Sequence, residues 1–413
     1  MENILKALAA FWLYLQKKRL NRISSTKPTF RLIAKTTSGL EDVLATELRQ
    51  LGATKVEILQ RAVSFESDKR LMYQANYRLR TALRILKPIA VFRVNNETQL
   101  YDQVQKISWP EYLTPEQTIA IDAVVSGKVF THSHYVALKT KDAIVDQLRN
   151  KFGKRPSVDV VDPDLRLNVH IAVDQCTLSI DSSGTSLHKR GYRSAVDKAP
   201  INEVLAAGLI QLSGWKADSH FVDCMCGSGT IPIEAAMYAM KIPAGYFRKE
   251  FGFARWPDFD KRLWQDVVTE ANDEINEFGF EIIGSDRSNK AIDIARQNTR
   301  QAHLHKDIKL FRKPMDEIEP PTEGGVVIIN PPYGERLEEK DLVALYKHIG
   351  DTFKKNFQGY KAWVISSDIP LLKQVGLKPS HKIKVYNGPL ECRFVCFDIF
   401  GGSYRNMKKH KAK

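Results

Sequence analysis

The sequence predicts two architectures in one chain: an α+β first half and, from residue 183, an α/β domain built on a mostly parallel sheet. Three observations support this. Up to Gly184, short strand-like and helical segments are mixed without a regular order. Beyond it, apolar strands alternate with helices, which implies a parallel sheet with helices on both faces. The last two strand-like runs are joined only by a turn at Gly388-Pro389, which predicts an antiparallel hairpin.

The elements expected in the first half follow from hydrophobic period and from turn residues. Strand-like alternation covers residues 29–37, two runs within 55–67, 117–127, and two runs within 166–184. Helical spacing covers residues 39–52, 68–90 and 133–153.

In the second half, strands and helices are expected to alternate. The expected strands are 221–223, 280–286, 307–314, 324–330, 361–368, 381–388 and 390–400. The expected helices are 230–241, 289–304 and a segment around 342–355. We expect a domain organisation of an N-terminal extension (1–28), two small α+β domains (29–70 and 71–182), the α/β domain (183–404) and a basic tail (405–413).

Composition indicates a partner of opposite charge. The 413 residues carry a net charge of +14, and a basic surplus of that size favours a polyanionic partner such as nucleic acid. The five cysteines do not form a secreted disulfide framework, which indicates a reducing, cytoplasmic location. Their C-x-C and C-x₃-C spacings do not match zinc ligands, so no metal site is expected. The apolar stretch near the N-terminus is too short to span a membrane, and no membrane partner is expected.

Acidic residues end three successive strands, where open α/β sheets bind ligands. Asp223 precedes the glycines Gly227 and Gly229 in "DCMCGSGT", Asp286 ends the next strand, and Asp316 follows the third. The glycines let a ligand approach the backbone, and an acid at the second tip suits a ribose. The G-x-G-x-x-G of dinucleotide sites and the Lys of a P-loop are absent here. A nucleoside with an amino-acid tail fits better, so the predicted cofactor is S-adenosylmethionine.

The fourth strand ends in "NPPY", with Asn330, Pro331, Pro332 and Tyr333 beside the cofactor site. An exocyclic base amine is a poor nucleophile because its lone pair is conjugated into the ring. The Asn330 side-chain oxygen and the Pro331 carbonyl can accept both N–H groups and free that lone pair. Tyr333 can stack on an unpaired base, and the prolines keep the turn rigid. Carbon methylation would require a cysteine nucleophile, and the nearest, Cys226, belongs to the cofactor loop.

Together these motifs resemble the THUMP-domain RNA methyltransferases, in particular the bacterial branch that makes N2-methylguanosine in 23S ribosomal RNA. The resemblance runs from Thr29 to about Tyr404 and is carried by "DSSGTSLHKRGYR", "APINEVLAAGLI", "DCMCGSGT", "FGFARWPDFDKRLWQDV", "NPPYGERL" and "GPLECRF". It implies ferredoxin-like and THUMP domains before a Rossmann-like class I methyltransferase domain with a mostly parallel seven-stranded sheet. Cys224 stands where the family usually has proline.

The resemblance implies roles residue by residue. The catalytic motif is Asn330, Pro331, Pro332 and Tyr333. The residues expected to hold S-adenosylmethionine are Asp223, Cys226, Gly227, Ser228, Gly229, Thr230, Asp286, Asp316, Asn330, Pro200, Ile201 and Asn202. The expected partner is RNA, ribosomal or transfer, and the oligomeric state is open.

Candidate RNA contacts are Lys189, Arg190, Tyr192 and Arg193 in "LHKRGYR", because phosphates need charge and bases need an aromatic ring. Phe251, Phe253 and Trp256 either shape the base pocket or form local core. Two other functions stay open at this point. One is an adenine-N6 methyltransferase acting on DNA or RNA, which would use the same Asn-Pro-Pro-Tyr chemistry. The other is a non-catalytic RNA-binding factor.

Overall fold

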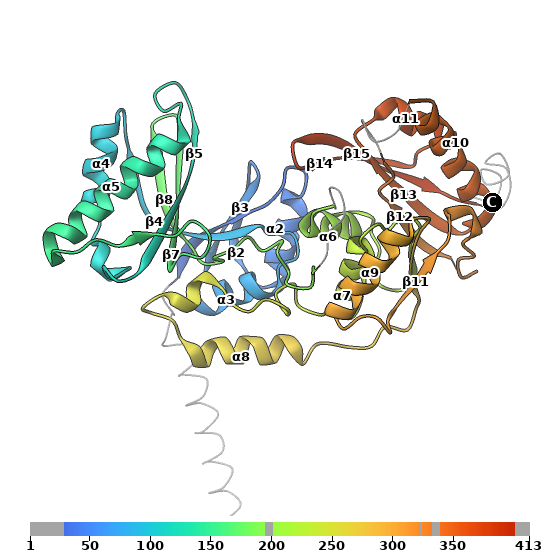
Figure 1. Cartoon of the computed structure of the whole chain (residues 1–413), viewed down its shortest axis with the longest axis horizontal. Coiled ribbons are helices and arrows are strands. Elements are labelled where there is room, and N and C mark those ends of the chain that lie inside the picture. Colours follow the sequence, from blue (N-terminus) through green and yellow to red (C-terminus); the bar gives the residue numbers. More distant parts are fainter. Residues whose placement is uncertain (1–28, 195–200, 323, 333–338, 401–413) are drawn as a thin grey trace, which may run out of the picture.

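The computed structural model describes residues 29–194, 201–322, 324–332 and 339–400. Two β-sheets organise these residues, one in each half of the chain. Figure 1 shows an elongated molecule in which the first sheet runs from one end to the middle, where β2 and β3 lie, and the second sheet occupies the other end. The expected N-terminal extension (1–28) and basic tail (405–413) lie outside the described residues.

The first half forms an eight-stranded sheet in the order β2-β3-β1-β4-β8-β7-β5-β6. Its strands are β1 (Phe30–Lys35), β2 (Thr54–Leu59), β3 (Ala62–Ser67), β4 (Arg84–Arg93), β5 (Thr118–Ser126), β6 (Ser157–Val158), β7 (Leu165–Ala172) and β8 (Gln175–Asp181). Its helices are α2 (Glu41–Gln50), α3 (Lys69–Arg78), α4 (Glu97–Gln105), the short η1 (Trp109–Glu111) and α5 (Ser133–Phe152).

The helix expected over residues 68–90 is wrong beyond Arg78. Helix α3 ends there, and the chain re-enters the sheet as β4, which pairs with both β1 and β8. Pro88 lies in β4, where the register with β8 shifts. Proline lacks the N–H that a helix interior needs and is tolerated at such irregularities in strands. Strand β4 thereby joins the two small α+β units into one continuous sheet.

The second half forms a seven-stranded sheet in the order β11-β10-β9-β12-β13-β15-β14. Its strands are β9 (His220–Asp223), β10 (Ile282–Asp286), β11 (Ile308–Arg312), β12 (Gly325–Ile329), β13 (Tyr360–Ser366), β14 (His381–Asn387) and β15 (Leu390–Asp398). All pairings from β11 to β13 are parallel, whereas β15 pairs antiparallel with β13 and β14. The predicted parallel sheet with a closing hairpin is confirmed.

Helices cover both faces of this sheet. One apolar core lies under α6 (Glu203–Leu212) and α7 (Thr230–Ala239), and the other under α10 (Glu339–Asn356) and α11 (Ile369–Gln374). The remaining helices are α8 (Lys261–Asn272), α9 (Asn289–Gln301), η2 (Gly252–Arg255) and η3 (Met315–Glu317). Because the strands have apolar residues on both faces, they read in the sequence as continuous apolar runs rather than as alternation.

The two halves are joined by a segment inserted between α7 and β10 (residues 240–281), which contains η2 and α8 and which we call the insertion. Figure 1 shows α8 lying alongside α3 at the base of the molecule. The ion pair Arg70–Glu270 connects the two helices, and Arg78 of α3 pairs with Glu274, two residues beyond the end of α8. No helix within the described ranges is long and apolar enough to cross a membrane.

Candidate active site

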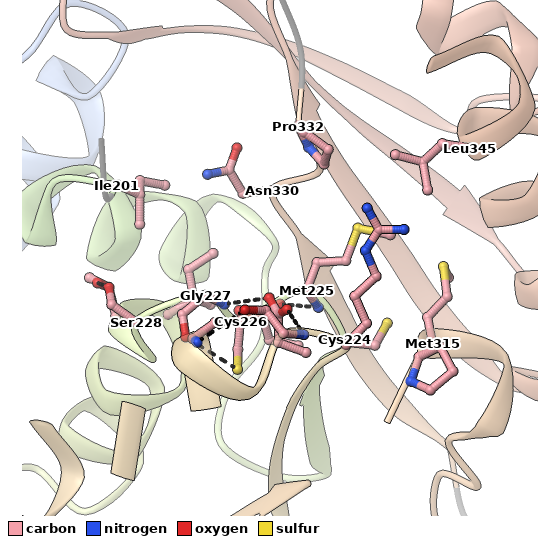
Figure 2. Close-up of a pocket in the computed structure, with 18 of the residues that line it drawn as sticks. Ile201, Cys224, Met225, Cys226, Gly227, Ser228, Met315, Asn330, Pro332 and Leu345 are labelled. Atoms are coloured by element: carbon pink, nitrogen blue, oxygen red, sulfur yellow. Dashed lines mark hydrogen bonds between the residues drawn. The ribbon is translucent and has the colours of Figure 1, made fainter. Parts of the chain in front are cut away.

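A cavity of about 360 Å³ opens at the carboxyl ends of β9, β10 and β12. Its size falls within the range of ~300–1,000 Å³ that is usual for small-molecule sites. Figure 2 shows the cofactor-loop residues on one side of it and Asn330 and Pro332 on the other. It is lined by Ile201, Asp223, Cys224, Met225, Cys226, Gly227, Ser228, Thr230, Ile231, Asp286, Arg287, Ser288, Ala291, Pro314, Met315, Asp316, Asn330, Pro332, Leu345 and His348.

The loop between β9 and α7 is fixed to the end of β10 by its own backbone. The Cys226 N–H donates to the Ser285 carbonyl over 2.9 Å, and the Gly227 N–H donates to the Asp286 carboxylate over 3.1 Å. Gly229 has φ +80°, and a Cβ there would lie 3.2 Å from the Cβ of Ala295 on α9. The left-handed backbone and the close helix both favour glycine at this position. This loop geometry leaves the first turn of α7 open toward the cavity.

The two carboxylates at the strand ends have different environments. Asp223 is 1% exposed and accepts one backbone N–H, from Met225 at 3.1 Å. Burial raises its pKa well above the ordinary range, and the nearby Asp286 carboxylate adds to this. A cationic group in the cavity would therefore be stabilised by Asp223. Asp286 accepts from the Gly227 and Ser288 backbones and keeps further acceptor capacity for hydroxyl donors.

A third acid, Asp316, lies on η3 and is paired with a histidine from another element. The His348 Nε2 atom on α10 is 3.3 Å from its carboxylate. His348 and Leu345, three residues apart on one face of α10, both line the cavity. Met225 and Met315 also line it. No signal in the sequence marks these four residues, because a side chain that faces a cavity and one in ordinary core look alike in hydrophobic pattern.

Asn330 follows the last residue of β12 and faces the cavity. Its side-chain oxygen is buried and has no hydrogen-bond partner among the residues that the structure describes. A buried acceptor without a partner costs free energy, which makes it ready to bind an N–H donor. Pro331 is buried and Pro332 lines the cavity. Tyr333 lies outside the described residues.

Comparison with known proteins agrees with this arrangement. Three families match the chain: the RlmL ferredoxin-like domain over residues 31–86, the THUMP domain over 94–181, and the RMKL-like methyltransferase domain over 190–395. A putative RNA methyltransferase of Synechocystis, slr0064, is 39% identical over 91% of this chain and 98% of its own length. The chain belongs to this family of THUMP-domain RNA methyltransferases.

Two further comparisons extend this result. The ribosomal RNA large subunit methyltransferase K/L of Syntrophotalea carbinolica is 39% identical over 89% of this chain. The match covers only 53% of that longer protein. The crystal structure of SMU.472, a putative methyltransferase complexed with S-adenosylhomocysteine (SAH), is 32% identical, with a TM-score of 0.82 over 92% of this chain and 100% of the other. The methyltransferase fold and its S-adenosylmethionine cofactor are therefore established for this chain.

The methyltransferase brings most of the predicted cofactor residues together. Asp223, Cys226, Gly227, Ser228, Thr230, Asp286, Asp316, Ile201 and Asn330 all line the cavity. Gly229 supports the loop without lining it. Asn202 caps α6 by accepting the Val204 N–H over 2.9 Å, which gives it a local structural role. Pro200 lies outside the described residues.

The predicted RNA contacts divide into two classes. Lys189 is exposed, and the Arg193 side chain is 15% exposed. Arg190 and Tyr192 are each only 1% exposed. For these two the prediction of RNA contact is wrong, because both bind the fully buried carboxylate of Glu234 on α7. Only the tertiary fold brings that partner next to them.

The aromatic residues of the insertion are core and not part of the cavity. Phe251, Phe253 and Trp256 are 4%, 1% and 7% exposed. Phe253 stacks on Tyr73 of α3 with ring centroids 4.4 Å apart. Of the two readings left open by the sequence, the structure therefore favours core that joins the insertion to the first half of the chain.

Proposed function

We propose that this RNA methyltransferase transfers a methyl group from S-adenosylmethionine to the exocyclic N2 amine of a guanosine in large-subunit ribosomal RNA. The observation that carries the proposal is the buried, unpartnered side-chain oxygen of Asn330 at the end of β12, facing the cavity. An unpartnered acceptor matches the N–H donors of a base amine. It has no favourable interaction with a carbonyl oxygen or a ring carbon.

The cavity fits the cofactor by size and by donor set. Asp223 would hold the ammonium group, Asp286 the ribose hydroxyls, and Asp316 the adenine edge, since each lines the cavity from a different strand end. The burial of Asp223 supports its assignment to the ammonium group, because a cation offsets the cost of removing a carboxylate from water. When bound, S-adenosylmethionine supplies an electrophilic methyl group.

The chain's own residues act on the amine. Asn330 accepts one N–H and the Pro331 carbonyl accepts the other, so that the nitrogen becomes more tetrahedral and its lone pair points away from both acceptors. Tyr333 stacks on the base in this proposal. The two prolines restrict the turn, so the acceptors need little reorganisation when charge develops on nitrogen. Asn330 is no base, and the proton of the product ammonium leaves to water.

The choice of ribosomal RNA rests on one of the two relatives at 39% identity. The Syntrophotalea carbinolica protein is named as a ribosomal RNA large subunit methyltransferase, and this chain spans about half of its length. The THUMP match and the net charge of +14 support an RNA substrate more generally.

The test uses RNA from cells that lack the gene. Ribosomal and transfer RNA are digested separately, and N2-methylguanosine is quantified in each by mass spectrometry. We expect a loss confined to large-subunit ribosomal RNA, restored by wild-type protein but not by Asn330→Ala. A loss confined to transfer RNA would support N2 methylation of guanosine and would show that the substrate is transfer RNA. Unchanged N2-methylguanosine with reduced N6-methyladenine would overturn the choice of base.

A further inference from the structure

Two hollows extend the active-site cavity toward the first half of the chain. The nearer one, of about 460 Å³, is lined by residues 188–193 and 201–203 except Tyr192. The farther one, of about 300 Å³, lies between residues 161–163, the segment 183–191 and residues 247–255. Ile201 lines both the cavity and the nearer hollow, whereas Lys189 and Gly191 line both hollows. The three spaces therefore lie next to one another, and we call the two hollows together the junction groove.

The floor of the junction groove is rigid because buried charges hold it. Arg190 donates to Glu234 and to the Arg80 carbonyl, and the Tyr192 hydroxyl donates to Glu234 over 2.9 Å. Gly191 between them has φ +102°, and a Cβ there would lie 2.3 Å from the Phe247 carbonyl oxygen. Only glycine allows that approach.

Arg248 fixes the insertion to residues 183–189, the segment through which the chain enters the methyltransferase domain. The Arg248 guanidinium donates to the carbonyls of Ser183, Thr185, Ser186 and Lys189. Its Nε is buried and has no partner within the described parts of the chain. The two walls of the groove are therefore one connected structure rather than separate loops.

The lining of the junction groove is basic. Its cationic residues are Lys189, Arg193, Arg248, Lys249 and Arg255, against the acidic residues Asp162, Glu203 and Glu250. Arg190 also lines it but is buried and paired with Glu234. The acids are occupied: Arg255 pairs with Asp162 and Glu250, and Arg193 pairs with Glu203. Lys189 and Lys249 are exposed on different segments of the lining. Such a surface suits a chain of phosphates.

We propose that the junction groove holds the single-stranded RNA next to the target nucleotide, with phosphates on Lys189 and Lys249. This rests on the proposed function, because a base that reaches Asn330 must be unpaired and its neighbour then leaves the cavity as a single strand. The groove leads that strand to the loop at 161–163, which lies within the THUMP match.

The test compares the double variant Lys189→Ala/Lys249→Ala with wild type and with Lys306→Ala. Lys306 is an exposed lysine just before β11, at the opposite ends of the parallel strands from the cavity. Binding of a fluorescent 12-nucleotide single-stranded RNA is measured by anisotropy across salt concentrations. The slope of log K against log salt should flatten by about 0.7 for each lost phosphate contact in the double variant. Lys306→Ala should keep the wild-type slope.

Methyl transfer to unmodified, transcribed large-subunit ribosomal RNA gives a second readout. We expect the KM for RNA to rise about tenfold in the double variant, with kcat and S-adenosylmethionine affinity unchanged. If wild type transfers no methyl group to this RNA, the proposed function fails. The binding assay still shows whether the junction groove binds single-stranded RNA. A double variant with wild-type salt slope and RNA affinity overturns the groove, and so does equal binding of a duplex of the same length.

Discussion

The guanidinium of Arg190 lies 3.3 Å from the carboxylate of Glu234, and the two side chains are 1% and 0% exposed. The pair joins the entry segment of the methyltransferase domain to α7, whose first turn borders the cofactor cavity. Tyr192 adds a hydrogen bond to the same carboxylate. Removing one partner of such a pair leaves an uncompensated buried charge.

We therefore expect Glu234→Gln to destabilise the protein by about 3–5 kcal/mol. Its thermal midpoint, followed by circular dichroism, should fall clearly below that of wild type. Asp293→Asn is the control, since it breaks the exposed pair with Arg296, and it should change stability by less than ~1 kcal/mol. A Glu234→Gln protein with the same thermal midpoint as wild type would contradict the stabilising role of this pair.

The Asn330 side chain is expected to act in transfer and not in folding. Asn330→Ala should lower kcat by about 100- to 1,000-fold, the usual cost of removing one preorganised polar group from an active site. Calorimetric titration should give nearly unchanged S-adenosylmethionine affinity. Asn276→Ala, at an exposed position away from the cavity, is the matched control. Near-normal turnover by Asn330→Ala would contradict the proposed mechanism.

The raised pKa of Asp223 makes a prediction about pH. A carboxyl whose folded pKa lies above its unfolded value stabilises the protein at low pH, and this contribution is lost as pH rises through the folded pKa. Without cofactor, Asp223→Asn should therefore melt higher than wild type at pH 7, with the gain shrinking toward pH 4. The same variant should bind S-adenosylmethionine more weakly. A lower midpoint at pH 7 together with intact affinity would exclude this account.

His188, on the wall of the junction groove, gives a second pH prediction. Burial, then the charge of Arg190, lowers its pKa to about 4. A depressed histidine pKa favours folding above the unfolded value of ~6.5, and stability is lost as pH falls from there toward 4. His188→Gln should therefore keep more of its pH 7 stability at pH 5 than wild type does.

Thermal midpoints measured from pH 7 to pH 4 test this expectation. His305→Gln, an exposed histidine before β11, serves as control. Parallel curves for His188→Gln and wild type across that range would show that protonation of His188 does not limit acid stability.

The ion pairs that α3 makes with Glu270 of α8 and with Glu274 just beyond it are expected to align the first half of the chain with the active site. Each exposed pair contributes only about 0.2–1 kcal/mol, so Glu270→Lys/Glu274→Lys should still fold. We expect its KM for RNA to rise severalfold at unchanged cofactor affinity. Adding Arg70→Glu and Arg78→Glu should restore it at low salt. No rescue by the swapped charges would mean that the pairs do not set the alignment.

Much of the second half could be predicted from the sequence because its signals are local. Alternating strands and helices gave the parallel sheet, and the turn at Gly388-Pro389 gave the hairpin. The position of Asp223 and Asp286 directly after apolar strands placed them at one edge, and both line the cavity. The domain boundaries at 70 and 182 and the catalytic roles of the motif stay predictions.

The sequence by itself determined which chemistry the strand ends carry, since strand direction alone brings those ends together. Only the tertiary structure decided which neighbours in 188–193 are buried and which face the groove. Arg190 and Glu234 are 44 residues apart, and no local period reveals such a pair. The positions of His348 and Leu345 in the cavity could not be predicted either. A helical pattern shows which face is covered, but it does not show whether packing or a ligand covers it.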